Sequence, residues 1–358
     1  MLTDADLELL TTLTHLPTIA GVEDAAIDHV RSWVAERPDL VCRSDAAGNL
    51  LIACDGVEPT LLVTAHLDHP GFIVSGAGAR QDVEFRGGVR APYFEDADLV
   101  FFTPEPVAAR LVSFDHTAGT GVVEPVTPLP VGSLGRWSFE DGSLGLSGDL
   151  LHAPACDDLA GVAAALSVID RTRLDVGSRH LGVLLTRAEE VGFVGAIAAC
   201  DLGTIPPGAE VVCIETSRSF EWSPIGAGPV VRVGDRVSVF TPALTGRMSS
   251  VAAALDAPTQ RKLMDGGACE ATAFAAWGYS STCVCLPLGN YHNQGDLDAV
   301  ESGGGRARPA PEFISTRDHA GLIELLVAFA SGGAGFDDDL QERLRARFES
   351  HRHLLDPR

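Results

Sequence analysis

The sequence predicts an α/β sandwich with a substantially parallel sheet, into which a small β-domain is inserted. Short apolar runs typical of buried strands alternate with stretches that carry apolar residues at helical spacing. Between residues 72 and 150 this alternation gives way to short β-prone pieces separated by glycine and proline. A chain of 358 residues, of which 46% are hydrophobic and 21% charged, is long enough to bury the core of such a fold.

The first two elements are helices, expected at residues 3–15 and 23–37. Apolar residues recur there at helical spacing, and acidic residues occupy the first turns, where the helix dipole favours them. Buried strands are expected, in chain order, at 50–54, 61–65, 181–186, 211–215 and 281–286. Further helices are expected at 158–171, 193–200, 266–277 and 316–331. Strands that alternate with helices predict a parallel sheet, whose active site lies beyond the carboxyl ends of the strands.

The inserted segment contains no long helical stretch. Its β-prone pieces are FIVSG, VEFRGG, DLVFF, ARLVSF and GTGVVEP. They predict a small β-barrel or β-sandwich over residues 72–150, inserted into a catalytic domain formed by 1–71 plus 151–358. Residues 301–311, with the sequence ESGGGRARPAP, are expected to form a flexible loop.

Composition argues against several function classes. A net charge of −23 without a basic cluster argues against nucleic-acid binding. No apolar run approaches the roughly 18 residues of a membrane span, and the acidic start MLTDADLELL does not resemble a signal peptide, so a cytoplasmic protein is expected. The eight cysteines are scattered without a C-x-x-C pair, and we expect no catalytic role for them.

Two pairs of candidate site residues lie in the first half of the chain. His66 closes the strand LLVTA, and Asp68 lies two residues on, where it can receive the imidazole N–H that does not face a metal. Asp157 and Asp158 stand together at the start of a predicted helix. A helix N-terminus attracts carboxylates, which is one explanation of this pair. The other is that Asp157 bridges two metal ions while Asp158 orients a neighbour or caps the helix.

The later strands end on charged or imidazole side chains as well. Glu189 and Glu190 follow the strand LGVLLT, and two like charges at the tip of a buried strand repel unless a cation or a proton compensates them. One of the two can bind metal while the other acts as general base on the attacking water. Glu215 ends the apolar strand VVCIE, and His292 follows the strand STCVCL.

Each of these residues alone has an ordinary structural explanation, such as a helix cap or a polar strand end. Their joint order of His, Asp, Glu-Glu, Glu and His predicts a metal centre. Mixed imidazole and carboxylate ligands suit Zn²⁺, with Co²⁺ or Mn²⁺ as substitutes, and two ions sharing a carboxylate and a water form a two-metal hydrolase site. The candidate ligands are His66, Asp157, Glu190, Glu215 and His292.

The motifs AHLDHPGFIV, CDDLAGVAAAL, AEEVGFVGA, CIETS and NYHN resemble those of the co-catalytic metallo-aminopeptidases of the clan that holds the M28, M20 and M42 peptidases. The motifs extend from position 65 to 293. The 91 positions from His66 to Asp157 suit an inserted β-domain, and the 77 positions from Glu215 to His292 are too few for the M20 lid domain. The M42 family, that of glutamyl aminopeptidases, is therefore the best match.

The resemblance implies a three-layer α/β sandwich with a mainly parallel, mixed sheet, as in zinc exopeptidases, and an inserted small β-barrel. It also implies two divalent metal ions per chain, assembly into a homo-oligomer, and short peptides as substrates. The family pattern places the bridging aspartate four residues before Gly161, which selects Asp157. The roles carried over are terminal ligands for His66 and His292, a bridging ligand for Asp157, carboxylate ligands for Glu190 and Glu215, the general base for Glu189, and orientation of His66 for Asp68.

Three departures from the M42 pattern bear on the substrate. His69 stands where the family usually has an acidic residue, Asn290 precedes Tyr291 and His292, and the segment QGDLDAVESGGGRARPAP is inserted after them. They are expected near the substrate pocket.

Three hypotheses follow for the function. The first is an aminopeptidase in which Glu189 takes a proton from the metal-bridging water. The second is a metal-dependent deacylase of N-acyl amino acids, small amides or modified peptides on the same site. The third is a non-catalytic scaffold that keeps the fold. A serine hydrolase or a P-loop protein is not expected, because no intact G-x-S-x-G and no P-loop occur.

Overall fold

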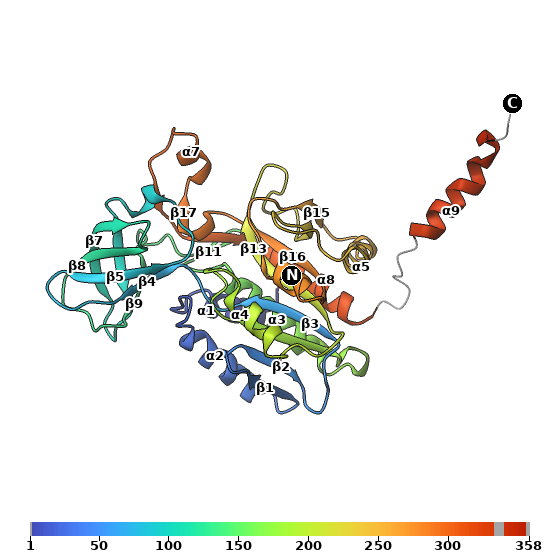
Figure 1. Ribbon diagram of the computed structural model, residues 1–358, viewed down its shortest axis with the longest axis horizontal. Helices are drawn as coiled ribbons and strands as arrows, with labels where there is room; N and C mark the ends of the chain where they lie inside the picture. Colours follow the sequence, from blue (N-terminus) through green and yellow to red (C-terminus); the bar gives the residue numbers. More distant parts are fainter. Residues whose placement is uncertain (1, 333–339, 356–358) are drawn as a thin grey trace.

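The computed structural model describes residues 2–332 and 340–355. Its largest element is an eight-stranded mixed sheet at the centre of the body (Figure 1). In spatial order its strands are β1 (Leu40–Ser44), β2 (Leu50–Cys54), β12 (Leu181–Thr186), β3 (Leu61–His66), β13 (Glu210–Arg218), β16 (Ser280–Leu288), β14 (Val230–Gly234) and β15 (Gln260–Leu263).

The four central strands of the sheet, β12, β3, β13 and β16, run parallel to one another. They are apolar almost throughout and buried on both faces, as a parallel sheet between two helical layers requires. Their carboxyl ends therefore meet at one edge of the sheet. β2 and β14 flank them in antiparallel orientation.

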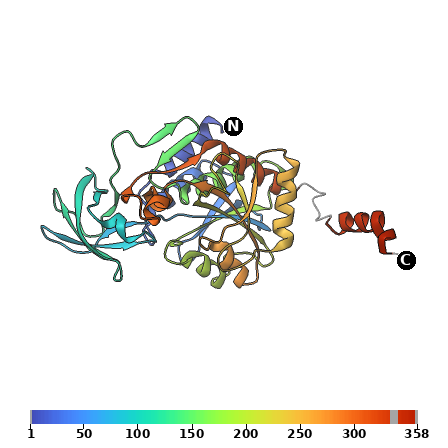
Figure 2. The same ribbon diagram turned by 90° about the horizontal axis from the view of Figure 1, so that it is seen from above.

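Helices cover both faces of the sheet and complete a three-layer sandwich (Figure 2). Successive residues of β3 point to opposite faces, so that Val63 and Ala65 join one apolar cluster and Leu62 joins the other. One cluster includes residues of α1 (Asp4–Leu13), α2 (Asp24–Ala35), α3 (Leu159–Thr172), α5 (Pro242–Ala254) and α8 (Thr316–Ala330). The other includes residues of α4 (Val194–Asp201) and α6 (Glu270–Ala276).

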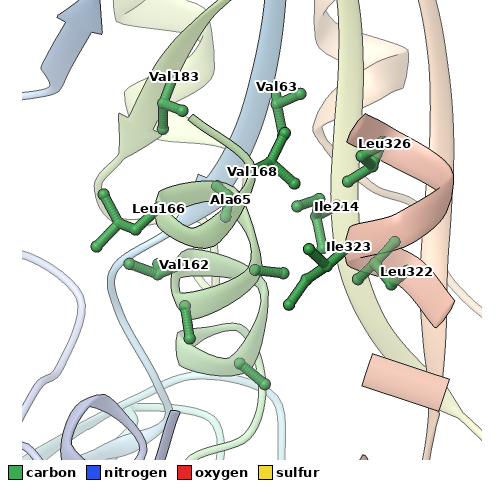
Figure 3. Packing of buried hydrophobic residues seen from close by; sticks show 14 of the residues in the cluster. Val63, Ala65, Val162, Leu166, Val168, Val183, Ile214, Leu322, Ile323 and Leu326 are labelled. Carbon is green, nitrogen blue, oxygen red and sulfur yellow. The ribbon is translucent and has the colours of Figure 1, made fainter. Parts of the chain in front are cut away.

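The core of the body lies between α3, α8 and the parallel strands (Figure 3). Val162 and Leu166 of α3 and Ile323 of α8 lie in one cluster with Val63 and Ile214 of the sheet. All five side chains are at most 1% exposed. This close packing fixes the start of α3, and the acidic residues that precede α3, against the carboxyl ends of the strands.

A closed six-stranded antiparallel barrel lies beside the body (Figure 1). Aromatic rings fill it, with Phe72 packed edge-on against Trp137 at a centroid distance of 4.8 Å. Around the barrel the strands are β4 (Gly71–Val74), β5 (Gln81–Arg86), β8 (Thr120–Pro125), β7 (Val107–Asp115), β6 (Asp98–Phe101) and β9 (Leu134–Trp137).

Smaller elements connect the barrel, the body and the chain end. A three-stranded sheet consists of β10 (Gly145–Ser147), β11 (Leu150–Ala153) and β19 (Glu312–Ser315). Near the barrel lie β17 (Gln294–Gly295), α7 (Leu297–Glu301) and β18 (Arg308–Pro309). Helix α9 (Leu340–His351) stands apart from the body in both views (Figures 1 and 2).

The predicted fold class is confirmed: the chain combines a mixed α/β sandwich, parallel at its centre, with a closed β-barrel. Each predicted strand and helix has a counterpart, although α6 begins at Glu270 rather than at 266. The flexible loop expected at 301–311 is interrupted: residue 301 ends α7, and Arg308–Pro309 form β18, which pairs with β17. The division into 1–71 plus 151–358 and 72–150 stays a prediction. In the part of the chain that the structure describes, none of the helices combines the length and the hydropathy that a membrane span needs.

Candidate metal centre

The site lies where the parallel strands end. Thr186, the last residue of β12, is level with His66, the last residue of β3. Glu189 and Glu190 lie in the loop that follows β12, and Glu215 lies within β13, the neighbour of β3 on its other side. Adjacent carboxyl ends therefore bring side chains together that are far apart in the sequence.

Asp157 occupies the centre of the group. Its Oδ1 lies 3.3 Å from Nε2 of His66, and its Oδ2 lies 3.4 Å from Nε2 of His292. The two imidazoles thus face opposite oxygens of one carboxylate. All three side chains are almost fully buried, with at most 4% of each residue exposed.

Two groups of possible metal ligands share this aspartate. His66, Asp157 and Glu215 form one, and Asp157, Glu190 and His292 form the other, with the ligand atoms of each group within 4.8 Å of one another. The five residues predicted as ligands therefore come together in two overlapping sets of three. A further group of the same kind joins Glu189 to His66 and Glu190.

Hydrogen bonds on the far side of each imidazole orient the two rings. Nδ1 of His66 lies 3.1 Å from the backbone carbonyl oxygen of Asp68 and 3.6 Å from its carboxylate. Nδ1 of His292 donates to the carbonyl of Gly88, at 2.7 Å, in a segment that follows β5 of the barrel. Such bonds leave Nε2 of each ring facing the centre of the site, as metal-binding histidines require.

The carboxylate of Asp68 has a second task that the sequence did not predict. Its two oxygens accept the backbone N–H groups of Glu189 and Glu190, at 2.9 and 3.0 Å. Asp68 is fully buried. It therefore fixes the loop that carries both glutamates as well as lying beside His66.

The start of α3 differs from an ordinary capped helix. Asp158 is its N-cap residue, but the side chain makes no capping hydrogen bond. The explanation of the Asp157–Asp158 pair as a helix cap is thus not supported by the geometry. Burial raises the pKa of Asp158 well above its usual range.

Several buried carboxylates lie close together in this group, and their mutual repulsion and burial determine its electrostatics. Burial raises the pKa of Glu189 and of Glu215 well above the ordinary value. Oε1 of Glu215 is buried and, within the residues described, has no hydrogen-bond partner. An unpaired buried carboxylate is costly, so this arrangement fits a bound cation.

The same surroundings favour the charged forms of His66 and Asp157. Burial lowers the pKa of His66, but Glu189 and Asp157 outweigh it and hold that pKa well above its ordinary value. Burial also opposes ionisation of Asp157, yet hydrogen bonds from His292 and His66 lower its pKa below the usual range. The carboxylate of Asp157 is thus the one most firmly ionised, as a bridging ligand must be.

Two residues that sequence reasoning missed support Asp157. The hydroxyl of Thr216 donates to Oδ1 of Asp157 at 2.8 Å. Glu312, fully buried on β19, accepts the backbone N–H of Asp157 at 3.0 Å, and burial raises its pKa to about 7. A threonine directly after a predicted ligand was a usable signal for the first, whereas the short strand around Glu312 carries no motif.

His69 was expected near the substrate pocket, and it lies next to Asp157, a pocket-lining residue, without lining the pocket itself. The ring is buried beneath the site, where Nδ1 donates to the carbonyl oxygen of Asp157 at 2.6 Å. Nε2 lies 3.1 Å from Oδ1 of Asn293. His69 therefore contacts the backbone of a candidate ligand and does not belong to the pocket wall.

A pocket of about 540 Å³ opens directly onto the group. Its lining includes Asp157, Glu189, Glu190, Glu215 and His292. Apolar and basic side chains from several elements line the remainder of its wall, among them Arg90, Arg218, Phe220, Arg232, Met264 and Leu297. A small amide or peptide end can therefore approach the candidate ligands from one side.

Comparison with known sequences points to the aminopeptidases. The family model of the M42 glutamyl aminopeptidases matches residues 131–302. A putative aminopeptidase from Acetivibrio thermocellus is 22% identical over 311 residues, which cover 80% of this chain and 91% of the relative. These two matches support an enzyme of the aminopeptidase type.

Solved structures share the fold. The TET aminopeptidase of the marine sediment archaeon Thaumarchaeota archaeon SCGC AB-539-E09 has a TM-score of 0.75 at 18% identity and covers 92% of this chain and 97% of its own. The TET1 peptidase of Pyrococcus horikoshii has a TM-score of 0.74 at 18% identity, with 91% of this chain and 99% of that chain covered. The resemblance to the M42 peptidases is thereby confirmed by sequence between residues 131 and 302, and the fold is that of the TET peptidases over about nine-tenths of the chain.

Proposed function

We propose that this chain is a two-metal aminopeptidase that removes N-terminal residues from short peptides. The observation that carries the proposal is the pair of ligand groups that share Asp157. Two three-residue groups around one bridging carboxylate are the arrangement of co-catalytic hydrolases. The match to the M42 family model points to the same chemistry.

The residues present fit two divalent cations. The unpartnered, buried Oε1 of Glu215 and the crowding of carboxylates around two imidazoles call for positive charge. The proposed ligands are His66 and Glu215 on one side, Glu190 and His292 on the other, and Asp157 between them. Mixed nitrogen and oxygen ligands favour Zn²⁺, with Co²⁺ or Mn²⁺ as substitutes. When bound, such ions polarise a scissile carbonyl and make water more acidic.

Glu189 is the proposed general base. Its carboxylate lines the pocket, lies 3.9 Å from Nε2 of His66 and is 11% exposed, so that a water molecule can reach it. The raised pKa of Glu189 suits a group that must accept a proton during the reaction. Glu189 takes the proton from the attacking water and returns it to the leaving amine, while Asp68 holds the glutamate loop in place.

The test combines metal analysis with kinetics on aminoacyl-anilides. Wild-type protein is expected to bind two metal ions per chain and to hydrolyse at least one substrate of the panel. Glu189→Gln is expected to keep both metal ions and to lose about 10²-fold or more in kcat, as is typical for loss of a general base. Full activity in a Glu189→Gln protein that retains its metal would refute this role.

A deacylase of N-acyl amino acids, or of modified peptides, is the second candidate. The guanidinium groups of Arg218 and Arg232 on the pocket wall favour it, because a blocked amino acid presents a free carboxylate. Adding N-acyl amino acids to the same panel separates the two. Turnover of blocked compounds alone would favour the deacylase, and metal-dependent turnover of any amide would exclude a non-catalytic scaffold.

We also propose that the chain forms a homo-oligomer. The Pyrococcus horikoshii TET1 peptidase can assemble into a tetrahedron or a large octahedral shell, and its fold matches nine-tenths of this chain. The mass of the purified protein, measured by light scattering, tests the proposal. A monomer at micromolar concentration would contradict it.

A further inference from the structure

The buried carboxylate of Glu312 lies between two segments of the candidate metal centre. Its strand, β19, pairs with β11, where Glu312 is level with Ala153. On the other side, Phe313 exchanges backbone hydrogen bonds with Gly289, at 2.9 and 3.2 Å. Ala153 lies shortly before Asp157 in the chain, and Gly289 lies shortly before His292.

Each oxygen of Glu312 binds one of these segments. Oε2 accepts the backbone N–H groups of Cys156 and Asp157, at 2.7 and 3.0 Å. Oε1 accepts the backbone N–H of His292 at 2.8 Å. Glu312 is fully buried, so water does not compete for these bonds. One side chain thus joins two segments that are more than 130 residues apart in the sequence.

We propose that Glu312 is a positioning residue that sets the relative placement of Asp157 and His292 by binding the backbone N–H groups of both. This inference rests on the proposed function, since it takes those two residues as metal ligands. Glu312 belongs to the C-terminal part of the chain and does not line the pocket.

Local structure explains why these segments need such an anchor. Asp157 precedes the first residue of α3, and His292 has a left-handed backbone with φ 54°, so neither lies in a regular ladder of hydrogen bonds. A buried N–H without a partner costs about 1–3 kcal/mol, and a non-glycine residue at positive φ needs support from its surroundings. A carboxylate offers both strong acceptors and enough of them.

Contacts on the opposite side of the same segments complete the support. His69 donates to the carbonyl oxygen of Asp157, and the amide nitrogen of Asn293 donates to the carbonyl oxygen of Pro154 at 2.9 Å. The N–H and the carbonyl group of Asp157 are therefore both held, and so is the carbonyl group of Pro154 upstream. Removing Glu312 releases the N–H side of both ligand segments at once.

Substitution by glutamine separates this role from simple filling of space. The new side chain of a Glu312→Gln protein has nearly the same volume but only one acceptor oxygen, so its NH₂ group faces either His292 or the Cys156–Asp157 segment. Glu312→Asp keeps the charge but is one methylene shorter, and its carboxylate reaches one segment only. Asp318→Asn is a matched control, because Asp318 is a buried carboxylate that accepts the N–H groups of Gly226 and Gly228 and contacts neither ligand segment.

The experiment measures Zn²⁺ affinity of the full chain by competition with a chromogenic chelator, together with the visible spectrum of the Co²⁺ form. Glu312→Gln is expected to bind Zn²⁺ roughly 10- to 100-fold more weakly and to shift the Co²⁺ spectrum, as supporting residues of metal sites do. Glu312→Asp is expected to fall between it and the wild type. Asp318→Asn is expected to lower the unfolding temperature while leaving affinity and spectrum unchanged.

Wild-type affinity and spectrum in a folded Glu312→Gln protein would overturn the inference. If that variant does not fold, Glu312→Asp decides in the same way. An Asp157→Asn protein keeps this failure distinct from failure of the proposed function. Should wild-type protein bind no metal, or Asp157→Asn bind it as tightly as wild type, the metal centre itself is wrong. Should Asp157→Asn lose metal while the Glu312 variants keep it, only the positioning role is wrong.

Discussion

Asp68 holds Glu189 in place through a hydrogen bond of 2.9 Å between its carboxylate and the backbone N–H of the glutamate. The second carboxylate oxygen holds the N–H of Glu190. A fully buried aspartate at the end of β3 thereby determines where a proposed base and a proposed ligand from the neighbouring strand lie. Asp68 shares this task with Glu23, which accepts the backbone N–H of Ala188 in the same loop at 3.1 Å.

Asp68→Asn is expected to lower kcat roughly 10- to 100-fold, with less than about a threefold change in KM. The amide has one acceptor oxygen, so its NH₂ group must face the N–H of Glu189 or of Glu190 and displace that residue. Steady-state kinetics at saturating metal, with the metal content of each preparation, measure the effect. Asp318→Asn serves as the control, and a kcat within about twofold of the wild type for Asp68→Asn would contradict the prediction.

Thr216→Val is expected to weaken metal binding about tenfold. The substitution keeps the shape of the side chain but removes the hydrogen bond to Oδ1 of Asp157, and bonds to charged groups contribute about 1.5–3 kcal/mol. Chelator competition measures the affinity. Thr282→Val is the matched control, because Thr282 is buried on the adjacent strand β16 and its hydroxyl pairs with that of Thr245.

The sequence predicted the candidate ligands because each follows a local pattern. Apolar runs that form central parallel strands end at or near His66, Glu215 and His292. Parallel strands end at one edge of their sheet. Their meeting thus follows from topology. The structure brings these residues together with Asp157 and Glu190, while their roles stay proposals.

The parts that the sequence did not predict depend on tertiary contacts. Glu312 lies on a four-residue strand whose pairing with β11 has no local signature. Three strands of the large sheet, β1, β14 and β15, were missed. β1 and β15 are short and partly exposed, and Arg232 interrupts the apolar run of β14. That His69 contacts the backbone of Asp157 instead of lining the pocket was likewise not predicted, because this contact is tertiary. Local periodicity does not describe such contacts.

Removal of metal is expected to lower the unfolding temperature by roughly 3–8 °C. A ligand that binds only the folded state stabilises it by about 2.7 kcal/mol at one hundred times its Kd, and two such ions by about twice that. An unfolding entropy of about 2.1 cal/mol/K per residue means that a chain of this length shifts by roughly 1–1.5 °C per kcal/mol. Thermal unfolding with and without a chelator measures the change, and Zn²⁺ in excess should reverse it. Asp157→Asn is expected to respond little to the chelator; an equal response in both proteins would contradict the proposed site.

Stability should rise with pH between about 4 and 6.5 because of His319. Burial lowers the pKa of this histidine in α8 to about 4, while its Nε2 donates to the carbonyl oxygen of Ala160 at 3.0 Å. The unfolded chain, with an ordinary histidine pKa near 6.5, binds more protons in that window. The stabilisation is therefore complete above pH 6.5 and is lost as the pH falls towards 4.

His319→Gln tests this assignment, because glutamine can keep the bond to Ala160 without titrating. Between pH 7 and pH 5 the wild type is expected to lose about 2 kcal/mol more unfolding free energy than the variant. Urea unfolding at the two pH values gives the comparison. Equal losses in both proteins would show that His319 does not contribute.

The Glu301→Gln substitution is expected to lower KM for substrates whose first residue is acidic. Glu301 of α7 forms ion pairs with Arg218, at 2.8 Å, and with Arg90, and both arginines line the pocket. Removing this charge leaves the guanidinium groups less compensated beside the substrate. Because such partly exposed pairs contribute about 0.2–1 kcal/mol, KM for a glutamyl-anilide should fall roughly two- to fivefold, with that for a leucyl-anilide unchanged.

The control for this prediction is Asp39→Asn, which removes one of the two carboxylate partners that Arg173 has among the residues described, away from the pocket. It should leave KM for both anilides unchanged, because its arginine cannot reach the substrate. A fall in KM for both substrates in Glu301→Gln would indicate that α7 limits access to the pocket rather than its charge. No change for either substrate would mean that Asp298, which also pairs with Arg218, compensates that arginine by itself.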